Sequence, residues 1–306
     1  MDILQAIIQG IVQGLTEFLP VSSSGHLSLS QHVMGVNLDG SIFFNVMLHL
    51  GTLVAVCAVY YKLIIRLIVA FFRMIGDIFT GKFHWKGMDE DRRMVVMLIL
   101  GLLPLLLFFI PIPGTGNNIK DYFELWAADN DILIEGVCFL ITGLLLTLGI
   151  RRSKQNSGRH SRTPGGRTQY TVGDALSVGL MQGIAALPGV SRSGSTLSVG
   201  LLRGINKQKA LDYSFILGVP AVLGASLLEF KDALETGAAF EPLPVIVGMI
   251  TAAVVGFLSI KAFKWLLKTD KLSIFAWYTF ILGIVVVIIG IIERIQGVNL
   301  FSGMPL

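Results

Sequence analysis

Three ionisable side chains in apolar surroundings could carry chemistry in this chain: Glu17, His26 and Arg192. They occur in two related segments, GIVQGLTEFLPVSSSGH at residues 10–26 and GLMQGIAALPGVSRSGS at residues 179–195. The segments match without a gap at a constant offset of 169 residues, the difference between positions 182 and 13 and between positions 194 and 25. A duplicated scaffold has therefore received unequal chemistry, with the acid and the imidazole in the first copy and the guanidinium in the second.

The serine and glycine residues of both segments favour an anion as the ligand. Each turn offers hydroxyls and a glycine that lets backbone N–H groups approach a ligand, and it precedes a helix N-terminus with partial positive charge. Arg192 adds a planar donor fork that matches phosphate. A single turn of this kind more commonly just caps a helix, but two copies with an arginine indicate a phosphate-type site. The expected contacts are Ser22, Ser24, Gly25, Ser191, Ser193 and Gly194.

Glutamine or glutamate recurs at positions 5, 9, 13 and 17, a spacing that places all four on one face of a helix. A carboxylate within a membrane is costly and usually faces a cavity or a partner. Glu17 has three open roles: it could hold a divalent cation beside the phosphate, with Gln13 supplying a neutral oxygen, act as a general base, or pair with Arg192. His26 directly follows the first turn and can exchange a proton near neutral pH, which favours a catalytic role.

The composition indicates an integral membrane protein. Of its 306 residues, 53% are hydrophobic and 14% are charged, and the mean hydropathy is +0.73, whereas soluble domains are roughly 45–50% apolar and about 25% charged. The net charge of +4 comes from loops between apolar runs, so membrane orientation explains it and nucleic-acid binding is not expected. Cys57 and Cys138 lie in apolar segments without a metal or redox pattern and are expected to pack as small residues. No Lys or Arg precedes the first apolar run, so a cleaved signal peptide is not expected.

The hydropathy pattern predicts an all-α polytopic membrane protein. A helix needs about 20 apolar residues to cross the hydrocarbon core. The two motif regions, residues 3–37 and 173–205, are each interrupted midway by Pro, Gly and serine, and we interpret them as re-entrant helical hairpins, with a kinked single span as the alternative. Six uninterrupted runs are long enough to span: 42–62, 93–112, 132–150, 208–230, 242–266 and 273–293.

The charges of the loops orient these spans. The segments 62–93, 151–167 and 261–271 carry an excess of Lys and Arg, which predicts that they lie in the cytoplasm. The segments 113–131 and 229–241 are acidic and are expected outside. The six spans alternate sides correctly under this assignment.

The chain is therefore expected to consist of two inverted-topology repeats, each with one re-entrant hairpin and three spans. The first repeat covers residues 1–150, a basic cytoplasmic linker covers 151–172, and the second repeat covers 173–306. Because three spans is an odd number, the second half is inserted upside down, so the first hairpin enters from outside and the second from the cytoplasm. Inverted repeats of this kind bring their helix breaks together near the bilayer midplane, so the two serine turns are expected to converge.

The run PVSSSGH at residues 20–26, preceded by Gln13 and Glu17, and the run PGVSRSGST at residues 188–196 resemble the undecaprenyl pyrophosphate phosphatase family, also called the bacitracin-resistance phosphatases. The resemblance covers nearly the whole chain. It implies a bacterial inner-membrane enzyme that removes one phosphate from undecaprenyl pyrophosphate and so recycles the lipid carrier for peptidoglycan. It further implies dependence on a divalent cation such as Mg²⁺ or Ca²⁺, an active site open to the periplasm, and bacitracin resistance through the shared lipid substrate.

The resemblance also assigns residues to roles. Glu17 stands at the second acidic position of the family motif, and Gln13 stands at the first, where many members have Glu. The resemblance implies that Arg192, the serine turns and a cation near Glu17 stabilise the transferring phosphoryl group. Ser23, His26 or a water activated by His26 is expected to attack the phosphorus. The residues matching the two serine motifs are Ser22, Ser23 and His26 in the first and Ser191, Arg192, Ser193 and Thr196 in the second.

The competing hypothesis is an inverted-repeat transporter or flippase of a lipid phosphate or another anion, which would use the same turns and arginine. Glu17 and His26 favour the hydrolase, because an anion carrier gains little from an added carboxylate. Small residues such as Gly218, Gly224 and Ala225 suit close helix packing, either within the chain or in a homodimer.

Overall fold

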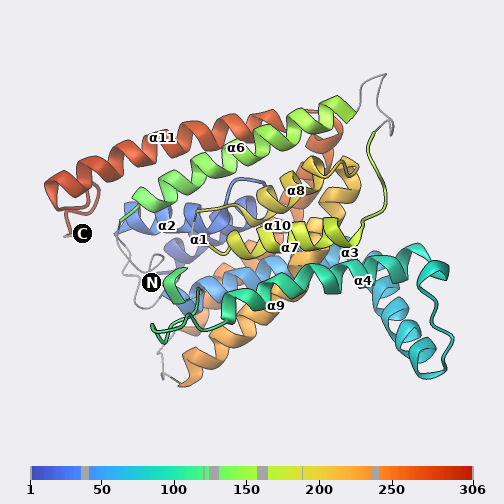
Figure 1. Ribbon diagram of the computed structural model, residues 1–306. Coiled ribbons are helices and arrows are strands. Elements are labelled where there is room, and N and C mark those ends of the chain that lie inside the picture. The colour runs from blue at the N-terminus through green and yellow to red at the C-terminus, as the bar shows by residue number, and fades with distance from the viewer. Residues whose placement is uncertain are drawn as a thin grey trace.

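The computed structural model describes residues 2–35, 41–119, 121–123, 131–156, 165–187, 189–235 and 241–304. Within these ranges the chain is helical, and the only β-structure is two isolated bridges. The helices lie side by side in one elongated bundle (Figure 1). This arrangement confirms the predicted all-α class.

Among the described residues, six helices are long and apolar enough to cross a membrane, in agreement with the six predicted spans. Their outer faces carry many exposed Leu, Ile, Val and Phe side chains, as expected of surfaces that face lipid. The spans are α3 (Ser41–Phe79), α4 (Glu90–Leu102) with its 3₁₀ continuation η3 (Leu103–Phe109), α6 (Leu133–Asn156), α9 (Lys207–Glu235), α10 (Pro242–Lys268) and α11 (Ser273–Gln296).

Two helices extend beyond the predicted spans. The helix α3 was expected to end near residue 62 but continues to Phe79, because residues 62–79 contain no proline, and it ends before Gly81, which has a φ of +67°. The helix α6 continues six residues into the expected linker and ends at Asn156. By contrast, α4 tightens into the 3₁₀ form at Leu103, since Pro104 lacks the N–H that an α-helix would use.

Both motif regions contain a pair of short helices with a break between them, as predicted. They are α1 (Ile3–Thr16) and α2 (Ser23–Met34) in the first copy, and α7 (Val172–Ile184) and α8 (Arg192–Leu202) in the second. None of these four reaches the length of about 20 residues that a span requires. Pro188 and residues 36 and 37, which belonged to the expected hairpins, lie outside the described residues.

Equivalent glycines in the two copies make equivalent contacts. Gly10 on α1 packs against α10, where a Cβ would lie 2.6 Å from the Gly248 carbonyl oxygen. Gly179 on α7 packs in the same way against the Gly101 carbonyl oxygen on α4. Only glycine permits such close helix contacts. The duplication therefore extends from the sequence to the way each half packs.

The two helix breaks touch one another. A Cβ on Gly25 would lie 3.0 Å from the Cα of Gly189, and a Cβ on Gly194 would lie 3.1 Å from the Cβ of Pro20. Because Gly25 corresponds to Gly194 and Pro20 to Gly189 under the sequence offset, the two contacts are reciprocal. The turns expected to converge do so.

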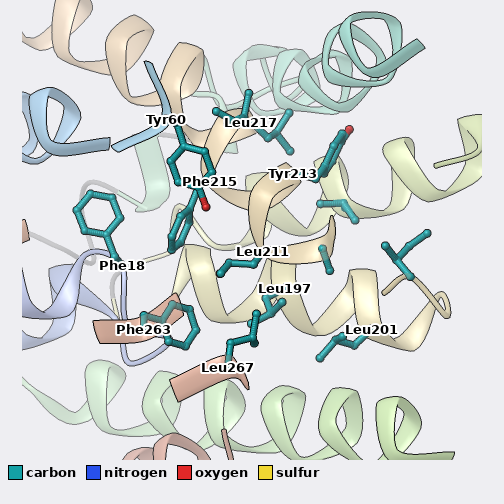
Figure 2. Packing of buried hydrophobic residues seen from close by; sticks show 14 of the residues in the cluster. Phe18, Tyr60, Leu197, Leu201, Leu211, Tyr213, Phe215, Leu217, Phe263 and Leu267 are labelled. Carbon is teal, nitrogen blue, oxygen red and sulfur yellow. The ribbon is translucent and has the colours of Figure 1, made fainter. Parts of the chain in front are cut away.

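Buried aromatic side chains cluster around Phe215, next to Phe18 (Figure 2). Phe215 on α9 makes edge contacts with Phe18, at 5.4 Å between ring centroids, and with Tyr60 on α3, at 6.0 Å. Phe263 on α10 lies 6.2 Å away on another side of the same ring. The segment that follows Glu17 is thus held against three long helices by apolar burial.

A buried ion cluster holds the start of α7. The carboxylate of Asp174 accepts hydrogen bonds from Arg167 at 3.1 Å and from Arg203 at 2.8 Å, and it completes a capping box with Thr171. Burial raises the pKa of Asp174, but the hydrogen bonds from Arg167, Thr171 and Arg203 outweigh this effect and hold the pKa well below its usual range.

One end of the bundle, on the right of Figure 1, gathers three segments. They are the end of α3, the end of α6 and the turn from α10 to α11.

Candidate functional site

The carboxylate of Glu17 is the centre of the candidate site. Glu17 is the C-cap of α1 and is only 6% exposed. One of its oxygens, Oε1, is paired with the guanidinium of Arg192, and the other, Oε2, accepts a hydrogen bond from Ser23 Oγ at 2.6 Å. The acid from the first copy, its neighbouring hydroxyl and the arginine from the second copy therefore meet at one point.

The Arg192 side chain packs against Gly218 on its way to Glu17. It is the first residue of α8, and its guanidinium lies against Gly218 on α9, where a Cβ would overlap the Nη1 atom. The sequence suggested that Gly218 serves close helix packing, whereas in the structure Gly218 makes room for the Arg192 side chain. The guanidinium is 20% exposed, so it lies at the edge of the buried cluster and can be reached by a ligand.

Gln13 and His49 complete the surroundings of Glu17. The amide nitrogen of Gln13 donates to Glu17 Oε2 at 3.0 Å and lies 2.9 Å from His49 Nδ1 on α3. His49 Nδ1 is 3.4 Å from the same carboxylate oxygen. Gln13 is fully buried, and its Oε1 atom has no hydrogen-bond partner within the described part of the chain. The predicted row of polar residues on α1 thus faces the protein interior.

The two serine turns have the same local structure. Ser22 Oγ accepts from the N–H of Gly25 at 3.3 Å at the start of α2, and Ser191 Oγ accepts from the N–H of Gly194 at 3.0 Å at the start of α8. Both serines are N-caps and both are buried. Ser22 has a φ of +73°, a strained conformation for a residue with a side chain. Each serine turn is thus followed directly by a helix N-terminus, the part of a helix that favours an anion.

The hydroxyls further along each turn form hydrogen bonds either with the other motif segment or within their own helix. Ser24 Oγ accepts from the N–H of Gly189 at 3.4 Å, whereas Ser193 Oγ donates to the carbonyl of Leu19 at 3.1 Å. Thr196 Oγ1 donates to the Arg192 carbonyl at 2.8 Å and lies 2.6 Å from Ser214 Oγ. Thr196 thus braces the helix that carries Arg192.

His26 points toward α11. Its Nδ1 atom lies 2.6 Å from the carbonyl oxygen of Ser22, which can only accept, so Nδ1 carries the proton. The other nitrogen, Nε2, then accepts from the hydroxyl of Tyr278 at 2.6 Å, and the two rings are stacked with centroids 5.7 Å apart. Of the four residues expected to be catalytic, Glu17, Ser23 and Arg192 are brought together, while His26 is held beside them by Tyr278.

A small pocket lies beside the ion pair, between Glu17, Arg192 and the facing sides of α3 and α9. Its other lining residues are mostly apolar: Phe18, Thr52, Leu53, Val56, Phe215, Gly218, Val219 and Val222. An ion pair next to apolar side chains suits a ligand with an anionic head and an apolar tail.

Three polar residues near the site were not singled out from the sequence. His49 and Glu135 lie within predicted spans, where an ionisable side chain is itself a signal of function that could have identified them. Glu135 Oε1 accepts from Ser28 Oγ at 2.8 Å, next to the junction of the turns. Tyr278 carries no such signal, because tyrosine is common in membrane spans.

The residues present fit a divalent cation of the kind expected. Glu17 offers a carboxylate, and the buried Oε1 atom of Gln13 offers an oxygen that no described group uses. No group of three or more His, Cys, Asp or Glu residues in the described part of the chain is arranged to hold a metal. An ion here would therefore take part of its coordination from the ligand, as Mg²⁺ does with substrate phosphates.

In the described part of the chain, six candidate spans surround an internal cluster of Glu, Arg and Ser, which defines a polytopic membrane protein. The model of the family described as bacitracin resistance protein BacA matches residues 6–285, and the chain belongs to that family. A protein of Alkaliphilus metalliredigens named undecaprenyl-diphosphatase is 38% identical over 95% of this chain and 100% of its own length. Proteins of the same name from Methanobrevibacter smithii and Treponema denticola are 38% and 39% identical over 94% and 93% of this chain and over 97% and 96% of their own lengths.

Proposed function

We propose that this chain is an integral-membrane phosphatase that hydrolyses undecaprenyl pyrophosphate to undecaprenyl phosphate and inorganic phosphate. The names of the relatives, which match over nearly their whole length, support the reaction. The observation that carries the proposal is the carboxylate of Glu17, which contacts both the Ser23 hydroxyl and the Arg192 guanidinium. A base, a nucleophile and a phosphate-binding cation are the groups that phosphoanhydride cleavage needs.

In the first step, Ser23 Oγ attacks the terminal phosphorus. The Ser23 proton passes to Glu17 Oε2, 2.6 Å away, a new oxygen–phosphorus bond forms, and the bond from that phosphorus to the bridging oxygen breaks. Undecaprenyl phosphate leaves with the bridging oxygen. Arg192 exchanges its contact with Glu17 for the transferring phosphoryl group and stabilises its charge.

In the second step, a water attacks the phosphoserine. The bond between Ser23 Oγ and phosphorus breaks, inorganic phosphate leaves, and Ser23 recovers its proton from Glu17. His26 Nε2 is the base that takes the proton of the water, exchanging its hydrogen bond from Tyr278 for one from the water, and it then gives this proton to the departing phosphate. Attack by His26 itself, or by a water without a phosphoserine, is the remaining route, and trapping a phosphorylated residue would separate these mechanisms.

A divalent cation, Mg²⁺ or Ca²⁺, is proposed to assist the reaction. Glu17 and Gln13 would hold it, and when bound it would neutralise charge on the pyrophosphate. The neighbouring N–H groups at the starts of α2 and α8 would orient the phosphate oxygens together with Ser22, Ser24 and Gly25 of the first turn and Ser191, Ser193 and Gly194 of the second. Thr196 supports Arg192 from one helical turn away.

We further propose that the fold is an inverted repeat with two re-entrant hairpins, divided at residues 150 and 173. The reciprocal contacts of the two breaks, and the equivalent packing of Gly10 and Gly179, support this topology. The charges of the loops support a site that opens to the periplasmic side of a bacterial inner membrane. Cysteine accessibility on either side of the membrane would test the orientation.

Two interactions complete the proposal. Bacitracin would act on this enzyme indirectly, because both bind the same pyrophosphate lipid.

A homodimer would use the exposed Gly224 and Ala225 on α9, since no described atom lies within 4 Å of a Cβ placed on Gly224. Light scattering of the purified protein in detergent would test the dimer.

The decisive experiment is phosphate release from undecaprenyl pyrophosphate by purified protein in detergent, with and without EDTA. We expect release that depends on metal and is lost in Glu17→Ala and Arg192→Ala, but kept in Glu90→Ala, which removes an exposed ion pair with Lys209. Absence of release by folded wild-type protein under all metals tested would overturn the proposal. The transporter hypothesis is not favoured by the names of the relatives, and turnover in detergent, where transport has no meaning, would exclude it as the whole function.

A further inference from the structure

We propose that the second half of α3, residues 61–79, lies along the surface of the membrane, with an apolar side among the lipids and a basic flank on anionic headgroups. The loop charges place most of this segment in the cytoplasm, and its helical form leaves an exposed apolar surface that the proposed activity does not use. We name this surface the outer stripe of α3, and it consists of Tyr61, Ile65, Ile68, Phe72 and Phe79.

The first argument is the length of α3. The helix has 39 residues, and a rise of about 1.5 Å per residue makes it about 58 Å long, whereas the hydrocarbon core is about 30 Å thick. A straight helix of this length would have to tilt by about 60° to stay inside the core, but membrane helices tilt by roughly 0–40°. In Figure 1 the cyan end of α3 projects from the side of the bundle. The second half of α3 therefore extends beyond the hydrocarbon core.

The second argument is the arrangement of the outer stripe. Its members follow one another at steps of three, four and seven residues, which places them on one side of the helix. Ile68 is the least exposed of them, at 50%, and Phe79 is the most exposed, at 86%. A continuous apolar stripe of this kind is unfavourable in water and marks a surface that contacts lipid or protein.

The third argument is the charge beside the outer stripe. Lys62, Arg66 and Arg73 are exposed, and their spacing of four and seven residues places them together on the flank next to the stripe. Trp85, exposed in the turn that follows α3, is a residue type typical of the membrane interface. A helix with an apolar side and a basic flank lies in the plane of the interface and is attracted to anionic lipids. Because the first half of the same helix spans the bilayer, the membrane surface is the nearest partner for the stripe.

The inner side of the segment is already fixed by the protein. Leu67, Ala70 and Met74 are buried in the main hydrophobic core. Asp77 forms an ion pair with Arg92 on α4, at 2.8 Å, which ties the end of α3 to the next helix. The segment therefore cannot rotate to bury the outer stripe, so a partner outside the chain has to cover it.

The first test asks what covers the outer stripe, in full-length protein reconstituted into phospholipid vesicles. A fluorophore is attached at Phe72→Cys or, as a second position, at Ile68→Cys, after Cys57→Ala and Cys138→Ala. Lipids with brominated chains quench a fluorophore within the bilayer, and iodide quenches a fluorophore in water. We expect strong quenching by the brominated lipid and little by iodide at both positions. Gln155→Cys, at the exposed end of α6, is the control and should show the opposite pattern.

Two results of this test would overturn the proposal. Stronger quenching by iodide than by brominated lipid at the stripe would place the second half of α3 in water. Protection from both quenchers would show that a second copy of the chain, rather than lipid, covers the stripe.

The second test concerns the basic flank. Vesicles of phosphatidylcholine and phosphatidylglycerol, with bromine on one lipid at a time, report which lipid lies beside the fluorophore at Phe72→Cys. Each basic residue near an anionic membrane strengthens the attraction about fivefold, so phosphatidylglycerol should be preferred by about fivefold or more. Arg73→Gln should lower this preference by about fivefold, whereas the control Arg73→Lys, which keeps the charge, should retain it. Equal quenching by the two lipids, or an unchanged preference in Arg73→Gln, would overturn the role of the basic flank.

Discussion

Ser23 Oγ lies 2.6 Å from Glu17 Oε2, although the two residues belong to different helices. The contact exists because α1 ends at Thr16 and α2 begins at Ser23, so the chain reverses between the acid and the hydroxyl. An unbroken helix would place residues six apart on different faces. The break in the membrane helix is therefore what creates a candidate nucleophile and its base.

The first prediction concerns that pair. Glu17→Gln keeps the size of the side chain but removes the base, so kcat for phosphate release should fall by about 10²- to 10⁴-fold, as for other general bases. Steady-state kinetics in detergent would measure it, with Glu90→Gln as a control for loss of one carboxylate. Turnover close to the wild type would rule out Glu17 as base.

The second prediction concerns the shape of the Arg192 donor. Arg192→Lys keeps the charge but removes the planar fork, so kcat/KM should fall by roughly 10- to 100-fold. The Glu17 carboxylate would also lose its guanidinium partner. Wild-type turnover in this variant would argue against direct contact between Arg192 and phosphate.

The third prediction uses two helical glycines. A methyl group on Gly218 would overlap Arg192 Nη1, so Gly218→Ala should displace the guanidinium and lower kcat/KM by at least about tenfold. Gly76→Ala adds the same methyl group to an exposed position of α3 where no described atom lies within 4 Å, and it should leave activity unchanged. Equal activity of the two variants would show that the position of Arg192 does not depend on Gly218.

The fourth prediction concerns the partner of His26. Tyr278→Phe removes the hydroxyl that lies 2.6 Å from His26 Nε2 while keeping the stacked ring. Because His26 gives up this hydrogen bond before it takes the proton of the water, its loss, worth about 1 kcal/mol, should raise kcat by up to several-fold and alter its pH profile, with KM little changed. Tyr61→Phe, at an exposed position on α3, is the control. An unchanged pH profile would separate Tyr278 from the reaction.

The fifth prediction concerns stability. Asp174→Asn leaves Arg167 and Arg203 without their carboxylate partner but still partly hydrated, so the free energy of unfolding should fall by about 1–2 kcal/mol, seen as a lower Tm. Because the folded state lowers the pKa of Asp174, its stabilisation is full above the unfolded carboxyl pKa of about 4 and is lost as the pH falls further. The Tm difference between the wild type and Asp174→Asn should therefore shrink in acid. A constant difference across pH would contradict this origin.

Some features of the fold follow from one-dimensional patterns. The six spans are recognisable because a membrane helix needs a long apolar run, and the helix breaks because Pro, Gly and serine interrupt such runs. The end of α3 was harder to predict, since scattered charges after residue 62 suggest a loop, although they do not stop a helix that has no proline. The extension of α6 to Asn156 has the same cause.

The candidate site, too, could be predicted only in part from the sequence. Glu17 and Arg192 stand out because an ionisable residue in an apolar segment is costly unless it has a function. Their pairing across 175 positions could be anticipated from the duplication, which predicts that the two turns meet. The partners of the site residues on other helices could not be anticipated. For example, Tyr278 is 252 residues from His26, and no repeat relates the two.

By itself, the sequence determined that this is a membrane protein with a duplicated, interrupted helix and unequal charges in the two copies. Hydropathy and helix-breaking residues act locally, so they can be read along the chain. Only the tertiary structure decided that Ser23 and Arg192 share the carboxylate of Glu17, that His26 faces Tyr278, and that His49 joins Gln13. These contacts depend on how distant helices pack and rotate against one another, which is set by the whole bundle and by close approaches such as that at Gly218.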